Sequence, residues 1–453
     1  MPEVREIIDT SELKEFERIA AHSHIKGLGL KGLKAEFIAD GFVGQEEARE
    51  AAGIVVRMIK DGKFAGKGVL LAGVPGSGKT ALAIGIAREL GKDVPFVHLA
   101  ASEIYSAEVK KTEFLTQTLR KAIGVRIREM KKIYEGEVIE LDIKHKPHPY
   151  NPYYQIPVSA TIKLETKEDS RKLNVDQTFA IQFAQQGIEV GDVVAIDVDG
   201  GKIVKYGKSE RVIKKGEEEL YADKPVPLPD GKVFKEKEFV YLLTLHQIDM
   251  MRARSSLDIA SLIFGAERKE IDSEVRKETD ELVKEMVKEG KAELVPGVIF
   301  IDECSLLDIE TFAFLNRAME QELSPILIFA TNRGIATIRG TDYKSPHAMP
   351  IDLLDRLLII NTRPYTEKEI REIIKIRIKH EKVDVDDEAI EYLTKLGLEN
   401  SLRYALQLIV PTSILANNKK ASIEHVKQAE KLFSDVKRSV EFVKEFEKKF
   451  LEY

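Results

Sequence analysis

Hydrophobic positions in the first third of the chain follow the pattern of alternating helices and strands. Residues Gln45–Lys60 carry acidic side chains in the first turn and apolar side chains at helical spacing afterwards, which predicts a helix. The apolar run Gly68–Ala72 has the length and composition of a buried parallel strand. A further helix is predicted at Thr80–Leu90, a strand at Val94–Leu99 and a long helix at Thr112–Met130. The order strand, loop, helix indicates an α/β core.

Near Glu135 the helical period gives way to strict alternation of apolar and polar residues. Three runs alternate in this way: Glu137–Lys144, Val158–Glu165 and Val193–Val198. Asp199-Gly200-Gly201 lies between two strand-like runs and predicts a hairpin turn. The segment Lys146–Pro157 contains four prolines and is expected to be a loop, because proline is not compatible with a helix interior. We therefore expect a β-rich insert, a small barrel. Helical spacing returns in two segments, Leu257–Phe264 and Ser273–Glu289.

After Pro296 the α/β pattern resumes and then changes to helices alone. Apolar runs at Val298–Ile301 and Ile326–Ala330 predict two more strands, with a helix at Ile309–Leu323 between them. From Thr366 onward four helices are predicted: Glu367–His380, Asp387–Leu396, Ser401–Ala416 and Ile423–Phe433. The chain therefore consists of a parallel-sheet core interrupted by a β-rich insert and followed by a helical domain.

Composition narrows the class of protein. A chain of 453 residues is too long for one core and is expected to form two or three domains. The net charge of −6 is mild, so contact with nucleic acid would need a local basic patch. The single cysteine, Cys304, excludes an internal disulfide and fits a reducing compartment. We find no apolar signal core and no run near the roughly 20 residues of a membrane helix, so we expect a cytoplasmic protein without membrane contact.

A glycine-rich loop provides the first candidate chemistry. Residues Gly73-Val74-Pro75-Gly76-Ser77-Gly78-Lys79-Thr80 match G-x-x-x-x-G-K-[ST] and join a predicted strand to a predicted helix. The glycines allow backbone N–H groups to surround phosphates, and the helix N-terminus favours negative charge. Lys79 is expected to reach the β- and γ-phosphates and Thr80 to hold magnesium. The alternative is a chance glycine loop, which the flanking strand and helix disfavour.

The strand that ends at Ile301 is followed by two carboxylates. In a P-loop ATPase the first, Asp302, orders the magnesium shell, and the second, Glu303, polarises the attacking water. Alone, an acidic pair after a strand is usually a solvated strand end; the P-loop upstream favours the functional interpretation. Cys304 is expected to be a small packing residue and not a nucleophile.

Three polar residues further along could contact the phosphates. Asn332 follows a predicted strand at the edge where such sheets bind ligands, although it could be a turn residue. Arg356 could stabilise the transferred phosphoryl group of a neighbouring subunit, or form a salt bridge to Asp352 or Asp355. Arg403 follows a candidate helix cap at Ser401 and could touch the phosphates from the same subunit or lie on a solvated face.

A series of motifs in one order resembles the RuvB-like AAA+ ATPases, the Pontin and Reptin family. The resemblance extends from about His22 to Ser439, and the β-rich insert explains why roughly 220 residues separate Thr80 from Asp302. The motifs are HSHIKGLGL, FVGQEEARE, GVPGSGKTALA, YEGEV, AELVPGVIFIDE, FATNRG, DLLDRLLII, SLRYALQL and LFSDVKRS.

The resemblance implies roles for several of these residues. Asn332 resembles the first sensor, Arg356 the arginine finger and Arg403 the second sensor. Tyr365 lies where the family closes the adenine pocket. The residues that resemble the lining of the family's adenine pocket are His22, His24, Phe42, Val43 and Gly44. Without the resemblance, the two histidines would be interpreted as satisfying a buried loop. One departure is that Cys304-Ser305 stands where eukaryotic members carry a Val-His pair, which puts a role of that histidine in doubt.

The same resemblance implies an architecture. We expect an α/β AAA+ core with an insert that resembles an OB-fold and a helical lid. The expected segments are 1–125 for the first part of the core, 126–294 for the insert, 295–364 for the second part of the core and 365–453 for the lid.

Two functions fit these observations. The first is a motor: a homo-oligomeric ring, hexameric or doubled, that hydrolyses ATP with Mg²⁺ as a DNA helicase, translocase or remodelling enzyme. Nucleic acid would contact the insert or the pore. Basic side chains at 126–132 and the tyrosines Tyr150, Tyr153 and Tyr154 keep this possible, although the tyrosines could equally pack the barrel's core.

The second function is an ATP-switched scaffold for protein partners with weak nucleic-acid contact. A P-loop small-molecule kinase is disfavoured, because two arginine sensors and a helical lid serve a ring better.

Overall fold

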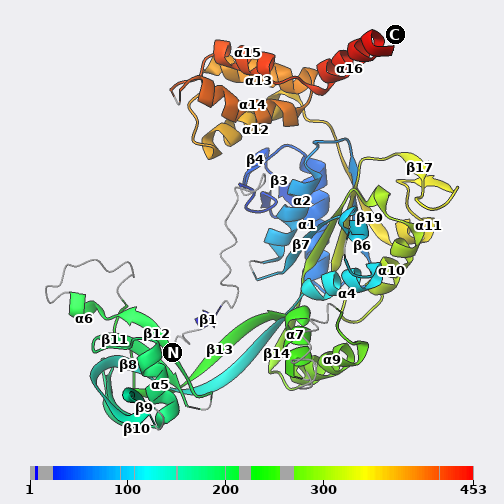
Figure 1. The fold of residues 1–453 in the computed structure, drawn as a ribbon. Helices are drawn as coiled ribbons and strands as arrows, with labels where there is room; N and C mark the ends of the chain where they lie inside the picture. Colours follow the sequence, from blue (N-terminus) through cyan, green and yellow to red (C-terminus); the bar gives the residue numbers. More distant parts are fainter. Residues whose placement is uncertain are drawn as a thin grey trace. The chain divides into compact units, whose positions relative to one another are not determined.

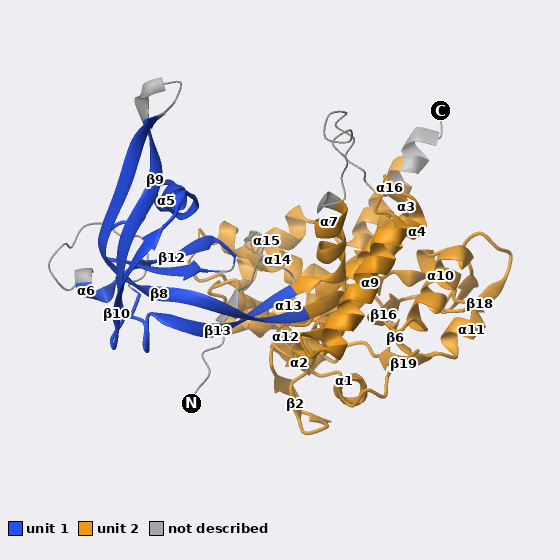
Figure 2. Ribbon diagram, turned by 90° about the horizontal axis from the view of Figure 1, so that it is seen from below, with its two compact units in different colours: residues 1–10, 126–242 blue, residues 11–125, 243–453 orange. Residues whose placement is uncertain are grey.

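The chain divides into two compact units. The computed structural model describes residues 6–8, 24–91, 93–106, 108–148, 151–198, 200–213, 226–255, 270–417 and 419–451. One unit comprises residues 1–10 and 126–242, and the other comprises residues 11–125 and 243–453 (Figure 2). His22, Tyr150, Asp199 and the predicted helix Leu257–Phe264 lie outside the described residues.

The larger unit is built on a five-stranded parallel sheet in the order β19-β6-β16-β15-β7. Figure 1 labels β6, β7 and β19 of this sheet. Its strands are β6 (Gly68–Gly73), β7 (Phe96–Ala100), β15 (Val298–Asp302), β16 (Ile326–Thr331) and β19 (Leu357–Thr362). Every residue of β16 is buried, as expected for a strand covered on both faces. The strands predicted from the apolar runs are therefore confirmed.

Helices cover both faces of this sheet, because successive strand residues point to opposite sides. Val69 and Leu71 pack with α1 (Glu46–Lys60) and α2 (Lys79–Leu90). Leu70, between them, packs with α4 (Lys111–Lys121) and α10 (Ile309–Met319) on the other face. Shorter elements of the core are α3 (Glu103–Ser106), the 3₁₀ turn Cys304–Leu306, α11 (Ile351–Leu354), and the two-residue or three-residue strands β2 (Leu30–Lys31), β3 (Lys34–Ala35), β4 (Ile38–Ala39), β5 (Phe42–Val43), β17 (Ile335–Thr337) and β18 (Lys344–Pro346).

The long helix predicted at Thr112–Met130 is wrong beyond Lys121. The helix α4 ends there, and strand β8 (Ile123–His148) begins two residues later. The physical reason is the sequence Ile123-Gly124-Val125-Arg126-Ile127-Arg128, in which β-branched and charged residues alternate with a period of two.

The smaller unit is β-rich, as predicted, and has its own apolar core. Its sheet contains β1 (Glu6–Ile8), β8, β9 (Asn151–Glu165), β10 (Ser170–Val175), β11 (Asp192–Asp197), β12 (Lys202–Lys208) and β13 (Phe234–Thr244). The helices are α5 (Gln177–Gln185) and α6 (Glu210–Ile213). Val138, Ile162 and Phe183 are completely buried within it. The hairpin predicted near Gly200 is confirmed, since β11 and β12 pair antiparallel with Asp197 opposite Lys202.

The loop expected at Lys146–Pro157 is instead the end of a long hairpin. Strands β8 and β9 pair antiparallel, with Pro147 opposite Gln155 and His145 opposite Pro157. The register shifts on either side of these pairs. Proline is tolerated in a strand where the ladder is irregular, because no hydrogen bond is then lost. Pro147 and Pro157 therefore lie beside irregular positions of the strand pair.

Two helices after the β-rich unit belong to the larger unit. Helix α7 (Leu245–Ser255) and helix α9 (Ser273–Lys288) precede β14 (Ala292–Pro296), which pairs with β8. Arg120 of α4 binds Asp249 of α7 and Asp280 of α9, and Asp249 is fully buried. These ion pairs hold the helices against the core.

The helical domain predicted after Thr366 is confirmed. It consists of α12 (Glu367–His380), α13 (Asp387–Glu399), α14 (Leu402–Leu415), α15 (Ile423–Leu432) and α16 (Val436–Leu451). Ser401 caps α14 by accepting a hydrogen bond from the Tyr404 N–H. Within the described residues, no helix is both long and apolar enough to cross a bilayer.

Candidate functional site

A cavity of about 640 Å³ lies within the larger unit, between the carboxyl edge of the parallel sheet and helices α12 and α14. This is the edge at which open α/β sheets bind ligands. Most of the described residues that the sequence proposed for the site line it: His24, Phe42, Val43, Pro75, Gly76, Gly78, Lys79, Thr80, Asp302, Glu303, Asn332, Tyr365 and Arg403. Motifs separated by more than 200 residues are therefore brought together.

The P-loop forms an open cradle on one side of the cavity. Gly76 and Gly78 have φ values of 77° and 87°, a left-handed region that favours glycine. A methyl group at Gly76 would meet nothing within 4 Å, whereas one at Gly78 would lie 2.3 Å from the Tyr365 hydroxyl oxygen. The backbone is therefore accessible to a phosphate at Gly76, and Tyr365 closes the loop at Gly78.

Two proposed P-loop residues support the loop from behind. The Ser77 hydroxyl is buried and bonds to the Val74 carbonyl at 2.8 Å and the Thr362 hydroxyl at 2.6 Å. A side chain at Gly73 would lie 2.2 Å from the Thr362 hydroxyl oxygen. Gly73 and Ser77 thus fasten the P-loop to β19 and do not line the cavity themselves.

Charged side chains of both signs line the cavity, and Lys79 lies among them. The Lys79 ammonium donates hydrogen bonds to the carbonyls of Gly73 (3.0 Å) and Val74 (2.8 Å) within its own loop. Burial lowers the pKa of Lys79, the Asp302 carboxylate acts to raise it, and Arg403 acts to lower it. Lys79 therefore interacts electrostatically both with the acidic strand end and with an arginine of the lid. Such a group of charges fits a polyanion bound together with a cation.

Asp302 and Glu303 occupy the end of β15. The Asp302 carboxylate accepts a hydrogen bond from the Glu303 N–H at 2.9 Å. Glu303 has a φ of 53°, an uncommon left-handed conformation for a side chain of its size, and such conformations occur often at functional sites. Cys304 is completely buried against Met349, and burial raises the pKa of its thiol. It is therefore a packing residue, as expected.

A segment before α1 forms the wall of the cavity nearest His24. Phe42 and Val43 are buried in β5, and the His24 ring lies 6.0 Å from that of His380 at the end of α12. Gly44 lies behind the wall, where a side chain would lie 1.8 Å from a Glu369 carboxylate oxygen. The wall and the lid are therefore in direct contact.

Arg356, the proposed arginine finger, is not among the residues that line the cavity of its own chain. It forms an ion pair with Glu320 at the end of α10, and its side chain is partly exposed. The sequence had offered Asp352 and Asp355 as alternative partners of Arg356, but this ion pair is formed with Glu320.

Apart from Tyr365 and Arg403, the lid residues that line the cavity were not identified from the sequence. Ile373, Ile376, Arg377 and Glu381 lie along one face of α12. Helix α14 contributes a similar stripe of Leu402, Leu406, Gln407 and Val410 beside Arg403. Helical spacing could have identified both stripes. It could not have told them from the stripes of Ile370, Ile374 and Ile378 or of Ala405, Leu408 and Ile409, which form the lid's own core.

Comparison with known proteins agrees with this site. Residues 18–369 match the family described as TIP49 P-loop domain, and residues 373–435 match the TIP49 AAA-lid domain. RuvB-like helicase 1 of Schizosaccharomyces pombe is 44% identical over 442 residues, which cover 95% of this chain and 96% of that protein. RuvB-like helicase 1 of Kluyveromyces lactis is 44% identical over 444 residues, which cover 95% of this chain and 97% of that protein. The chain therefore belongs to the TIP49 family of RuvB-like helicases, which are P-loop ATPases of the AAA+ type.

Proposed function

We propose that the chain binds ATP with Mg²⁺ in this cavity and hydrolyses it as one subunit of a ring. The observation that carries the proposal is that Lys79, Asp302 and Arg403, from three separate motifs, line one cavity. Asp302 and Arg403 both act on the pKa of Lys79 there, in opposite directions. Positive groups from the core and the lid that converge on an open glycine loop suit a triphosphate.

Each residue then has a role that its position supports. The P-loop backbone and Lys79 hold the phosphates. Thr80 and Asp302 are the residues that would hold Mg²⁺, and the ion would supply positive charge to the phosphate oxygens. Glu303 accepts a proton from the attacking water, and Asn332 orients that water or the γ-phosphate. His24, Phe42, Val43 and Tyr365 surround the base, and we keep His22 and Gly44 with them as predictions.

Arg356 is proposed to act on the nucleotide of a neighbouring subunit. Support comes from its absence among the residues that line its own cavity and from its partial exposure at the start of β19. An arginine supplied across an interface stabilises charge in the transition state and accelerates hydrolysis by several orders of magnitude. This role requires a neighbouring subunit, and we propose that the ring is a hexamer or a double hexamer.

The motor is favoured over the scaffold, because the two curated relatives are named helicases. In this proposal the β-rich unit or the ring pore contacts nucleic acid. The proposed segments are 1–125 and 295–364 for the ATPase core, 126–294 for the insert and 365–453 for the lid; residues 126–242 of the insert segment belong to the smaller compact unit and residues 243–294 to the larger. The single buried cysteine also supports a cytoplasmic location.

One experiment separates the two functions. The ATPase rate is measured with and without single-stranded DNA, beside the mass of the protein in solution. Stimulation by DNA together with strand displacement supports the motor. Ring formation on a protein partner, without stimulation or displacement, supports the scaffold. A protein that binds no nucleotide would contradict both.

A further inference from the structure

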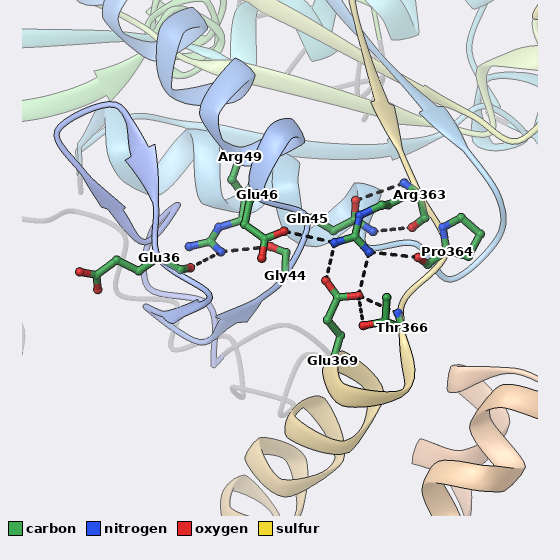
Figure 3. A network of polar contacts seen from close by, with 9 residues as sticks. All are labelled: Glu36, Gly44, Gln45, Glu46, Arg49, Arg363, Pro364, Thr366 and Glu369. Atoms are coloured by element: carbon green, nitrogen blue, oxygen red, sulfur yellow. Dashed lines mark hydrogen bonds and ion pairs between the residues drawn. The ribbon is translucent and has the colours of Figure 1, made fainter.

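The connection between the core sheet and the lid contains one arginine with partners on both sides. Residues 363–366 join β19 to α12, and the Arg363 guanidinium donates two hydrogen bonds to the Glu369 carboxylate, at 2.7 and 2.8 Å (Figure 3). The Glu369 side chain is 1% exposed, and that of Arg363 is 47% exposed. A paired contact of this kind fixes orientation as well as distance, because both planar groups must align.

Glu369 also organises the first turn of the lid. Its carboxylate accepts hydrogen bonds from the Thr366 N–H at 2.6 Å and the Thr366 hydroxyl at 2.9 Å. Burial acts to raise the pKa of Glu369, but the hydrogen bonds from Arg363 and Thr366 outweigh it, so the pKa lies below its ordinary value. The pair is therefore charged at neutral pH.

On the core side, Arg363 is held by the first residues of α1. The Gln45 amide donates to the Arg363 carbonyl at 2.5 Å, and the Arg363 N–H donates to the Gln45 side-chain oxygen at 3.2 Å. The guanidinium also contacts Glu46 at 3.2 Å (Figure 3). Arg363 thus links the start of α1 to the start of α12.

The start of α1 is in turn joined to the wall of the cavity. Arg49, which is completely buried, donates hydrogen bonds to the carbonyls of Leu28, Gly29, Glu36 and Gly44. Its guanidinium carbon lies 5.5 Å from the centre of the Phe42 ring. The segment that carries His24, Phe42 and Val43 is therefore held on α1, one turn from Gln45.

From these contacts we infer that Arg363 is a positioning residue, which sets the lid against the cavity wall through Glu369 and Gln45 and so places Arg403 on the nucleotide. The inference rests on the proposed nucleotide site, because Arg403 must act there. The inference adds Arg363, which does not line the cavity, to the residues on which nucleotide binding depends.

A label experiment measures the position of the lid directly. Cys304 is completely buried, so cysteines introduced at Lys63 in the core and Lys395 in the lid, whose side chains are 75% and 67% exposed, can be spin-labelled selectively. The Arg363→Gln variant is expected to broaden or shift the label distance distribution. The matched control is Arg371→Gln, which breaks an ion pair within the lid, between Arg371 of α12 and Glu391 of α13. Identical distributions in Arg363→Gln and the unchanged chain would overturn the inference.

A second variant guards against a folding defect. Arg363→Lys keeps the charge but cannot form the paired contact, so it is expected to show a loosened distribution as well. Complete rescue by lysine would also overturn the proposed mechanism, since it would mean that charge alone is sufficient.

Nucleotide binding then tests the link to Arg403. With a slowly hydrolysed ATP analogue and Mg²⁺, Arg363→Gln and Arg403→Ala are each expected to weaken binding about tenfold, and the double variant hardly more than either. Effects that multiply would mean that Arg363 does not act through the lid. If Lys79→Ala left binding unchanged, the proposed nucleotide site would be wrong, while the label distances would still decide the role of Arg363 in the lid.

Discussion

At the scale of single residues, the site is a balance of charges that are partly buried. The Lys79 ammonium donates hydrogen bonds to two carbonyls of its own loop. Burial and the Arg403 cation both lower its pKa, and only Asp302 acts against them. A polyanion in the cavity would bring negative charge to both Lys79 and Arg403, which repel each other.

The first prediction concerns that ammonium group. Lys79→Ala should weaken ATP binding itself, because it removes the positive charge that faces the phosphates. Binding is measured by calorimetry with Mg²⁺ and an ATP analogue. The control is Lys60→Ala, which removes another lysine that donates to a backbone carbonyl, that of Glu89, outside the cavity. An unchanged affinity in Lys79→Ala would mean that the glycine loop is not the site.

The second prediction separates binding from hydrolysis. Glu303→Gln preserves the shape of the side chain but removes the base, so turnover should fall about 10²-fold to 10⁴-fold while ATP still binds. Steady-state turnover and nucleotide affinity are measured on the same preparation. Glu310→Gln, on an exposed carboxylate of α10, should leave both unchanged. Near-normal turnover in Glu303→Gln would show that another group activates water.

At the scale of elements, caps and ion pairs decide where helices begin and what they contact. Asp308 accepts a hydrogen bond from the Thr311 N–H at 2.9 Å at the start of α10, and Lys111 of α4 binds the same carboxylate at 2.7 Å. Burial acts to raise the pKa of Asp308, but these hydrogen bonds outweigh it and lower the pKa to about 2. One carboxylate thus caps one helix and anchors another.

The third prediction follows from the sign of that shift. Because the folded pKa is lower than the ordinary 3.8, the stabilisation by Asp308 is complete above about pH 4 and is lost as the pH falls towards 2. Asp308→Ala should reduce stability by about 0.5–2 kcal/mol at pH 7, the usual effect of losing a cap. The difference between variant and unchanged chain in denaturant unfolding should shrink below pH 4. A constant difference down to pH 2 would exclude this role.

The fourth prediction concerns the β-rich unit. Residues 126–242 form a compact unit with its own core, and β8 and β13, which enter and leave it, are neighbouring strands. Replacing Glu137–Lys235 by a short linker should therefore leave the ATPase core folded and able to bind nucleotide. Circular dichroism and analogue binding check this. If the shortened chain bound single-stranded DNA as tightly as the intact chain, the proposed nucleic-acid contact through this unit would be wrong.

At the scale of the whole molecule, the proposed site depends on a second copy of the chain. Arg356 is paired with Glu320 within its own subunit and does not line its own cavity. If the arginine acts in a neighbour's site, every site is completed only when subunits associate. Activity should then rise with protein concentration as rings assemble.

The fifth prediction tests this dependence by mixing. Arg356→Ala should bind ATP nearly normally but not hydrolyse it, because the missing charge acts mainly in the transition state. A mixture with Glu303→Gln subunits joins an intact base to an intact arginine across some interfaces, so part of the activity should return. Glu320→Gln is the matched control, since it breaks the pair but keeps the arginine. No recovery under conditions of proven subunit exchange would place the action of Arg356 within its own chain.

Much of the fold is determined by local sequence. A strand covered on both faces must be apolar throughout, so β6, β15 and β16 were visible as short apolar runs. The P-loop and the acidic pair were also visible, because their chemistry requires neighbouring residues at a set spacing. The prediction of a helix at Thr112–Met130 was wrong beyond Lys121, because β-branched residues occupy every second position from Ile123 to Ile127 and form a strand.

Tertiary structure alone decided the contacts between distant segments. The sequence could not show that Arg356 pairs with Glu320, that α12 turns Ile373 and Arg377 to the cavity and Ile374 to the lid core, or that Arg363 joins Glu369 to Gln45. Hydrophobic periodicity identifies the faces of a helix but not the partner of each face. A polar side chain likewise has no partner until the backbone brings one within hydrogen-bond distance. The sequence by itself therefore determined the nucleotide chemistry, and only the folded chain decided how the lid is set against it.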